Sequence, residues 1–121
     1  MYLVATQGDG IYISSTRGST WSLTSAPSAS GVASDSTGTY LVAVVSGSGI
    51  YTSTSGGSSW TLTTAPLGAW YAVASNSAGS LLAAGQLGTG SIFISATSSI
   101  GNHDHLYNHN YRLTNHNLRY P

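Results

Sequence analysis

An internal repeat of about 40 residues is the feature that most constrains how this chain can fold. Gly10-Ile11-Tyr12 returns as Gly49-Ile50-Tyr51, 39 residues later, and Trp21 returns as Trp60 at the same spacing. Residues 32–36 return as 73–77, 41 residues later. Repeats with a period of roughly 20–50 residues indicate solenoids, propellers or similar arrays.

One repeat unit, residues 31–66, has room for four strands. Segments 31–34, 39–45, 49–53 and 59–64 carry β-branched runs or alternate large and small polar side chains, and turns rich in Gly and Ser separate them. No segment has helical periodicity, which argues against helical repeats and against a parallel sheet with helical crossovers. A β-solenoid is the alternative, but its repeats are usually shorter. The sequence therefore predicts an all-β fold of antiparallel, four-stranded, blade-like repeats, that is, a partial β-propeller.

The repeats extend over residues 1–100 as three units, 3–26, 31–66 and 70–95. By this alignment the first unit lacks its innermost strand and the third unit lacks its outermost strand. About ten strands, or two and a half blades, cannot close a ring, since propellers have roughly four to eight blades. We therefore expect the chain to pair with neighbouring propeller blades of a larger protein, or to self-associate through its open edges.

Two eight-residue turns, 14–21 and 53–60, share one design. In each turn a hydroxyl residue leads, a glycine holds position five, a hydroxyl residue position seven and a tryptophan position eight. The leading hydroxyl can hydrogen-bond the turn backbone, and the glycine permits a left-handed conformation. We expect the two tryptophans to occupy equivalent, largely buried sites. The repeat-defining structural residues are Ser14, Gly18, Trp21, Ser53, Gly57 and Trp60.

These two turns resemble the Asp-box, or BNR repeat, of sialidase-like β-propellers. They are also similar to the repeats of photosystem II assembly-factor-like and sortilin-like propellers, and the resemblance covers about residues 1–95. It implies that each turn joins the third and fourth strands of a blade, that the tryptophan packs between blades, and that the box is structural and not catalytic. The sequence departs from the motif at its defining position, where Thr16 and Ser55 stand in place of aspartate.

Composition excludes several classes of function. Charged residues make up 5% of the chain and the formal net charge is zero, so nothing favours nucleic acid or an anionic membrane as a partner. Cysteine is absent, which excludes disulfides and thiolate sites. No run approaches the roughly 18 apolar residues of a spanning helix, and no signal peptide is expected. Composition favours an extracellular or cell-surface location, with solubility supplied by hydroxyls, amides or glycans.

The sequence predicts that the chain is not an enzyme and needs no cofactor. Its carboxylates are Asp9, Asp35 and Asp104, of which the first two occupy typical turn positions. Arg17 is the sole arginine within the repeats, whereas a sialidase needs an arginine cluster for its substrate. The histidines all fall after residue 102, so no Ser/His/Asp arrangement forms within the repeats.

The predicted function is that of a non-catalytic scaffold or protein–protein interaction module. The alternative is a carbohydrate-binding propeller fragment of a sialidase-like or other secreted surface protein. Trp70 and Tyr71 depart from the repeat and are the candidate platform on which a glycan or peptide could stack. The competing interpretation of these two aromatics is that they fill the core between blades.

Residues 101–121 form a tail of different composition, rich in His, Asn and Tyr. Its weak candidates for metal ligands are His103, His105 and His109, because imidazoles suit zinc, copper or nickel. The other interpretation is a polar low-complexity tail, for which we expect no specific metal. A third follows from the genetic code: codons compatible with this tail, shifted by one nucleotide, encode a threonine-rich linker.

Overall fold

The computed structural model describes residues 1–8, 10–88, 91–96 and 106–107, and these residues form three antiparallel sheets. The first sheet contains β1 (Leu3–Gln7), β2 (Gly10–Ser14) and β3 (Ser22–Leu23). The second contains β4 (Gly31–Ser34), β5 (Leu41–Val44), β6 (Ile50–Ser53) and β7 (Thr61–Leu62). The third contains β8 (Trp70–Ser75), β9 (Leu81–Gln86), β10 (Ile92–Ala96) and β11 (Leu106–Tyr107).

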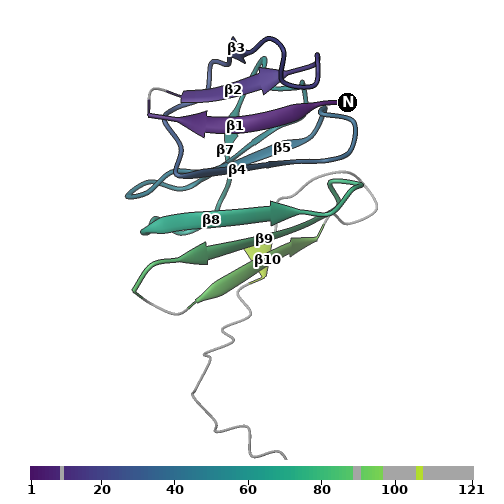
Figure 1. Ribbon diagram of the computed structural model, residues 1–121. Helices are drawn as coiled ribbons and strands as arrows, with labels where there is room; N and C mark the ends of the chain where they lie inside the picture. The colour runs from purple at the N-terminus through teal and green to yellow at the C-terminus, as the bar shows by residue number, and fades with distance from the viewer. Residues whose placement is uncertain (9, 89–90, 97–105, 108–121) are drawn as a thin grey trace, which may run out of the picture.

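Each sheet is a meander, because strands adjacent in the sequence are also hydrogen-bonded neighbours. The predicted all-β, antiparallel, blade-like architecture is therefore confirmed. The second sheet lies between the other two, with the first at one end of the molecule and the third at the other (Figure 1). Within the described part of the chain there is no helix long and apolar enough to cross a membrane.

The third sheet differs from the expectation in having its outermost strand. β11 pairs with β10 through Ile94↔Tyr107 and Ser95↔Leu106, so the described residues hold eleven strands where ten were expected. The sequence did not predict this strand, because residues 95–102, which correspond to the eight-residue turn in the third unit, lack the glycine at position five and the tryptophan at position eight. The first sheet consists of β1–β3, as expected for a unit that lacks its innermost strand.

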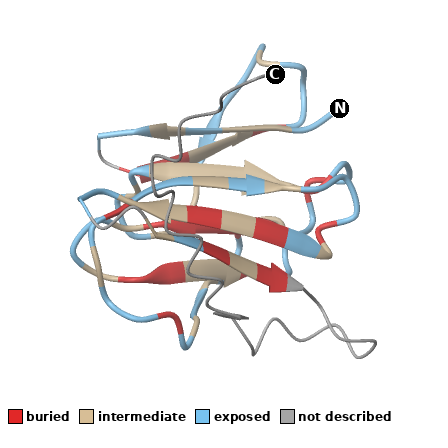
Figure 2. Ribbon diagram, turned by 90° about the horizontal axis from the view of Figure 1, so that it is seen from below, coloured by how far each residue is buried: buried red, intermediate tan, exposed pale blue. Residues whose placement is uncertain are grey.

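The hydrophobic core lies between the second and third sheets. Alternation along each strand places every second side chain on one face, and Figure 2 shows the resulting buried segments in strands at the middle of the molecule. Trp70 is fully buried there, and its ring lies edge-on to Phe93 with 4.8 Å between ring centroids. The core residues are Val42, Val44, Ile50, Ala65, Trp70, Leu82, Ala84 and Phe93.

Candidate functional site

The two eight-residue turns have matching hydrogen bonds at their leading serines. Ser14 Oγ accepts from the backbone N–H of Gly18 at 2.8 Å and of Thr16 at 3.3 Å. Ser53 Oγ accepts from the corresponding groups of Gly57 and Ser55 at 2.9 Å and 3.3 Å. Both serines are almost fully buried. Each hydroxyl therefore serves the turn backbone and is not presented to solvent.

The third position of each turn, where the Asp-box motif has aspartate, is also used for backbone hydrogen bonding. Thr16 Oγ1 accepts from the N–H of Thr20 at 2.8 Å, and Ser55 Oγ accepts from the N–H of Ser59 at 3.0 Å. A hydroxyl oxygen thus takes the acceptor role that a carboxylate oxygen can play in such turns. The fifth residues, both glycines, have φ angles of 88° and 86°, a left-handed conformation that glycine adopts without a steric penalty.

The expectation that Trp21 and Trp60 are equivalently and largely buried is wrong. Trp21 is 42% exposed, and its Nε1 donates to the carbonyl oxygen of Gly18 at 3.1 Å. Trp60 is half-buried, and its Nε1 is buried without a hydrogen-bond partner. The local sequences are alike, so the difference comes from what covers each turn. The turn of Trp60 lies against the first sheet, whereas the described residues place no sheet over the turn of Trp21.

The first sheet has a face on the side of Trp21 that no sheet within the described part of the chain covers. We refer to it as the first-sheet face; its residues are Leu3, Ala5, Tyr12, Trp21 and Leu23. Strand register makes Leu3 and Ala5 the counterparts of Leu41 and Ala43 in the second sheet. Leu41 and Ala43 are 3% and 0% exposed, while Leu3 is half-buried and Ala5 is exposed. The second sheet thus buries a face that the first sheet leaves open.

The third sheet has a face on its opposite side that no other described strand covers. This third-sheet face consists of Ala72, Ala74, Ala83, Gly85 and Ile92. Ile92 is the counterpart of Ile50, which is 2% exposed in the core, yet Ile92 itself is 37% exposed. Several of these residues line a shallow hollow of about 240 Å³. The residues that define the two faces are hydrophobic or glycine and carry no charge, and the polar groups beside the first-sheet face are the Tyr12 hydroxyl, Thr6 and Gln7.

The candidate stacking platform of Trp70 and Tyr71 is not formed. Trp70 is 0% exposed, and its Nε1 donates to the carbonyl oxygen of Pro66 at 3.0 Å. Tyr71 is 59% exposed. A register irregularity occurs in β8 between Trp70 and Ala72, and the two adjacent aromatics lie in different environments. Trp70 therefore fills the core, as the competing interpretation held, and Tyr71 alone lies at the surface.

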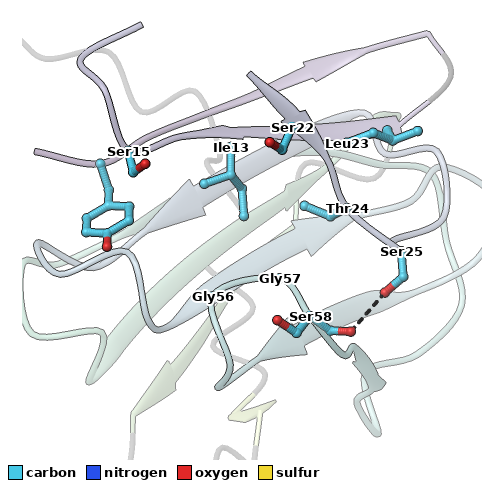
Figure 3. Close-up of a pocket in the computed structure, with 10 residues that line it drawn as sticks. Ile13, Ser15, Ser22, Leu23, Thr24, Ser25, Gly56, Gly57 and Ser58 are labelled. Atoms are coloured by element: carbon cyan, nitrogen blue, oxygen red, sulfur yellow. Dashed lines mark hydrogen bonds between the residues drawn. The ribbon is translucent and has the colours of Figure 1, made fainter. Parts of the chain in front are cut away.

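A hydroxyl-lined groove of about 410 Å³ lies between the first and second sheets (Figure 3). Across it Ser25 Oγ donates to the carbonyl oxygen of Ser58 at 3.2 Å. Among the described residues that line the groove there is no carboxylate, imidazole or cation, so these residues offer neutral hydrogen-bonding groups. Its residues are Tyr2, Ile13, Ser15, Ser22, Leu23, Thr24, Ser25, Gly56, Gly57 and Ser58.

Asp35 is used by its own turn. Its Oδ1 accepts from the backbone N–H of Thr39 at 3.0 Å and of Tyr40 at 3.2 Å, and its Oδ2 accepts from the Thr37 hydroxyl at 2.6 Å. Burial raises the pKa of Asp35, but the hydrogen bonds from Thr37, Tyr40 and Thr39 outweigh it and place the pKa below the ordinary 3.8. The equivalent turn of the third sheet, between β8 and β9, contains Asn76. Its Oδ1 accepts from the backbone N–H of Ser80 at 2.9 Å and of Leu81 at 3.1 Å.

We expect Asp35→Ala to lower the free energy of unfolding by about 1–3 kcal/mol, because it removes the acceptor of three part-buried hydrogen bonds, from the N–H groups of Thr39 and Tyr40 and from the Thr37 hydroxyl. Asp35→Asn should cost much less, since Asn76 shows that an amide oxygen can accept the same two backbone hydrogen bonds. The folded-state pKa is lowered, so the carboxylate stabilises the fold above about pH 4, and this stabilisation is lost as pH falls through the folded pKa. Urea unfolding at pH 7 and pH 3 should therefore show a larger loss on acidification in the wild type than in Asp35→Asn. Equal losses would contradict this role.

The remaining predicted residues fall partly outside the described part of the chain. His103, His105 and His109 lie outside it, as do Asp9 and Asp104. Within residues 1–8, 10–88 and 91–96 no group of three or more His, Cys, Asp or Glu side chains could hold a metal ion. Arg17 is exposed and has a φ of 57°, a left-handed conformation that is uncommon for a residue with a side chain.

The sequence was also compared with known proteins. No family model and no curated protein matches it.

Proposed function

We propose that this chain is a non-catalytic repeat scaffold or protein–protein interaction module that self-associates or forms part of a larger β-propeller. The observation that carries the proposal is the pair of apolar faces at the two ends of the stack of sheets. The second sheet buries both of its faces, while each end sheet buries one and leaves the other open. Uncovered apolar surface of this kind marks a site of association.

Two further features support a structural role. The motif-defining hydroxyls and glycines of the turns are used for backbone geometry, in keeping with the resemblance to Asp-box propellers. Asp35, the carboxylate within the described residues, is fully engaged by its turn. An extracellular or cell-surface location fits the nearly uncharged, hydroxyl-rich composition and is part of the proposal.

The groove between the first and second sheets favours one alternative, a carbohydrate-binding function. Its hydroxyl groups and Tyr2 are neutral partners suited to the hydroxyls of a glycan. A glycan array would test this alternative, with Ser22→Tyr as the variant that fills the groove. Binding by the wild type that is lost in Ser22→Tyr would favour the alternative over the scaffold.

Light scattering on the purified chain tests the proposed function. We expect association that increases with protein concentration, because burial of the two end faces removes apolar surface from water. The free energy gained on burial is about 25 cal/mol per Å² of apolar surface, reduced by the entropy lost on association. A folded chain that stays monomeric at high concentration would contradict the proposal.

A further inference from the structure

We propose that the third-sheet face of one copy stacks on the first-sheet face of a second copy, in a head-to-tail arrangement. This inference rests on the proposed function and specifies the partner and both surfaces. The partner is a second copy of this chain because the chain already contains the same contact between its own second and third sheets.

The internal contact joins opposite faces of successive sheets. From the second sheet it uses Val42, Val44 and Ile50, and from the third sheet Leu82, Ala84 and Phe93, with Trp70 of β8 also buried in this core. Each sheet therefore has one face for the sheet that precedes it and the other face for the sheet that follows. The first and second sheets follow the same rule, since Ile13 of the first sheet points at Gly57 of the second.

The uncovered residues occupy the same positions as these core residues. The strand registers align Leu3, Leu41 and Leu82, because each of these leucines lies opposite a serine of the next strand. By this alignment the third-sheet face supplies Ala83, Gly85 and Ile92 where the second sheet supplies Val42, Val44 and Ile50. The first-sheet face supplies Leu3, Ala5 and Tyr12 where the third sheet supplies Leu82, Ala84 and Phe93.

The two faces are also complementary in side-chain size, and neither carries charge. Ala83 and Gly85 are smaller than the valines at the equivalent core positions and line the shallow hollow of the third-sheet face. The first-sheet face instead carries the large side chains of Tyr12 and Trp21, which could fill that hollow. Neither face presents a charge that would repel the other. The first sheet has no described strand on the free side of β1, so the proposed contact uses β1–β3 of the second copy and has no counterpart of β8 and Trp70.

The contact is heterologous, because it joins two different faces. Successive copies therefore form a ring if the rotation between them closes and a filament if it does not.

Because the two faces differ, two variants can test the contact. Ala5→Glu places a charge in the first-sheet face, and Ala74→Glu places one in the third-sheet face. Both alanines are exposed in the single chain, so folding should survive each change. Ala78→Glu, at an exposed alanine in the β8–β9 turn outside both faces, is the matched control.

We expect each variant to lose the association seen in the wild type and to run as a monomer in light scattering, while the control associates normally. An equimolar mixture of the two variants should form a one-to-one heterodimer and nothing larger, because each variant retains the face that the other lacks. Circular dichroism establishes that both variants fold, and Ala5→Gln with Ala74→Gln replaces them if either does not.

The outcomes separate this inference from the proposed function. A monomeric wild type contradicts the proposed function itself. An associating wild type whose two variants associate equally well overturns the head-to-tail inference while the scaffold function stands. Dimers formed by one variant alone would show a face that pairs with its own copy, and this also overturns the inference.

Discussion

Trp70→Ala should lower the free energy of unfolding by about 3–5 kcal/mol. Trp70 is fully buried, lies edge-on to Phe93 and donates a hydrogen bond from its indole Nε1 to Pro66. Truncation would therefore leave a large cavity in the core between the second and third sheets and remove the donor that satisfies a carbonyl oxygen. Urea denaturation followed by circular dichroism measures the change, at a protein concentration where the chain is a single species.

The neighbouring residue provides the control for this prediction. Tyr71 is 59% exposed, and surface substitutions of this kind usually change stability by no more than about 0.5 kcal/mol. Tyr71→Ala should therefore leave the urea midpoint almost unchanged. If the two substitutions had similar costs, the core would not depend on Trp70 as its burial indicates.

The contrast between Trp70 and Tyr71 shows where sequence reasoning reached its limit. The sequence favoured either a stacking platform made of both rings or core filling by both, whereas adjacent residues in a strand point to opposite faces and only Trp70 is buried. The register irregularity in β8 adds to the ambiguity. The exposed ring therefore became evident only from the structure.

The strands themselves were largely predictable, because alternation and glycine turns are local properties. The expected strand at 49–53 is β6, Ile50–Ser53, and the expected strand at 31–34 is β4. Burial of the repeat tryptophans was not predictable in the same way. Trp21 and Trp60 sit in turns of matching design, yet they differ in exposure because the first sheet covers only one of the two turns.

The two uncovered faces were likewise beyond the sequence argument, which expected open strand edges. An edge is a row of unpaired backbone groups, whereas a face is defined by the side chains of several strands in register. Recognising the faces required the pairings that align Ile92 with Ile50 and Ala5 with Ala43. Once these pairings are known, the difference in burial at equivalent positions becomes visible.

The glycines at position five of the two turns provide the last prediction. Gly18→Ala and Gly57→Ala both place a Cβ on a left-handed residue, which costs about 1–2 kcal/mol. At Gly57 the added Cβ would also lie 2.7 Å from Ile13 Cδ1 and 2.9 Å from Thr24 Cγ2, whereas at Gly18 the nearest atom is Leu3 Cδ1 at 3.6 Å. Overpacking adds about 1–3 kcal/mol, so Gly57→Ala should cost about 2–5 kcal/mol in all.

Urea unfolding of the two alanine variants measures this difference, and Gly57→Ala should cost less in an Ile13→Ala background than in the wild type, because the smaller side chain makes room for the new Cβ. Equal costs at the two glycines would show that the first sheet does not cover the second turn as described.

In a head-to-tail assembly, however, Gly18 would meet Ile94 of a neighbouring copy, because Ile94 is the counterpart of Ile13. Gly18→Ala should then weaken association while costing the single chain only the penalty of about 1–2 kcal/mol for the left-handed conformation, whereas Gly57→Ala should cost the single chain more and leave association unchanged. The same substitution at two equivalent positions thus distinguishes the contact inside one chain from the contact between chains.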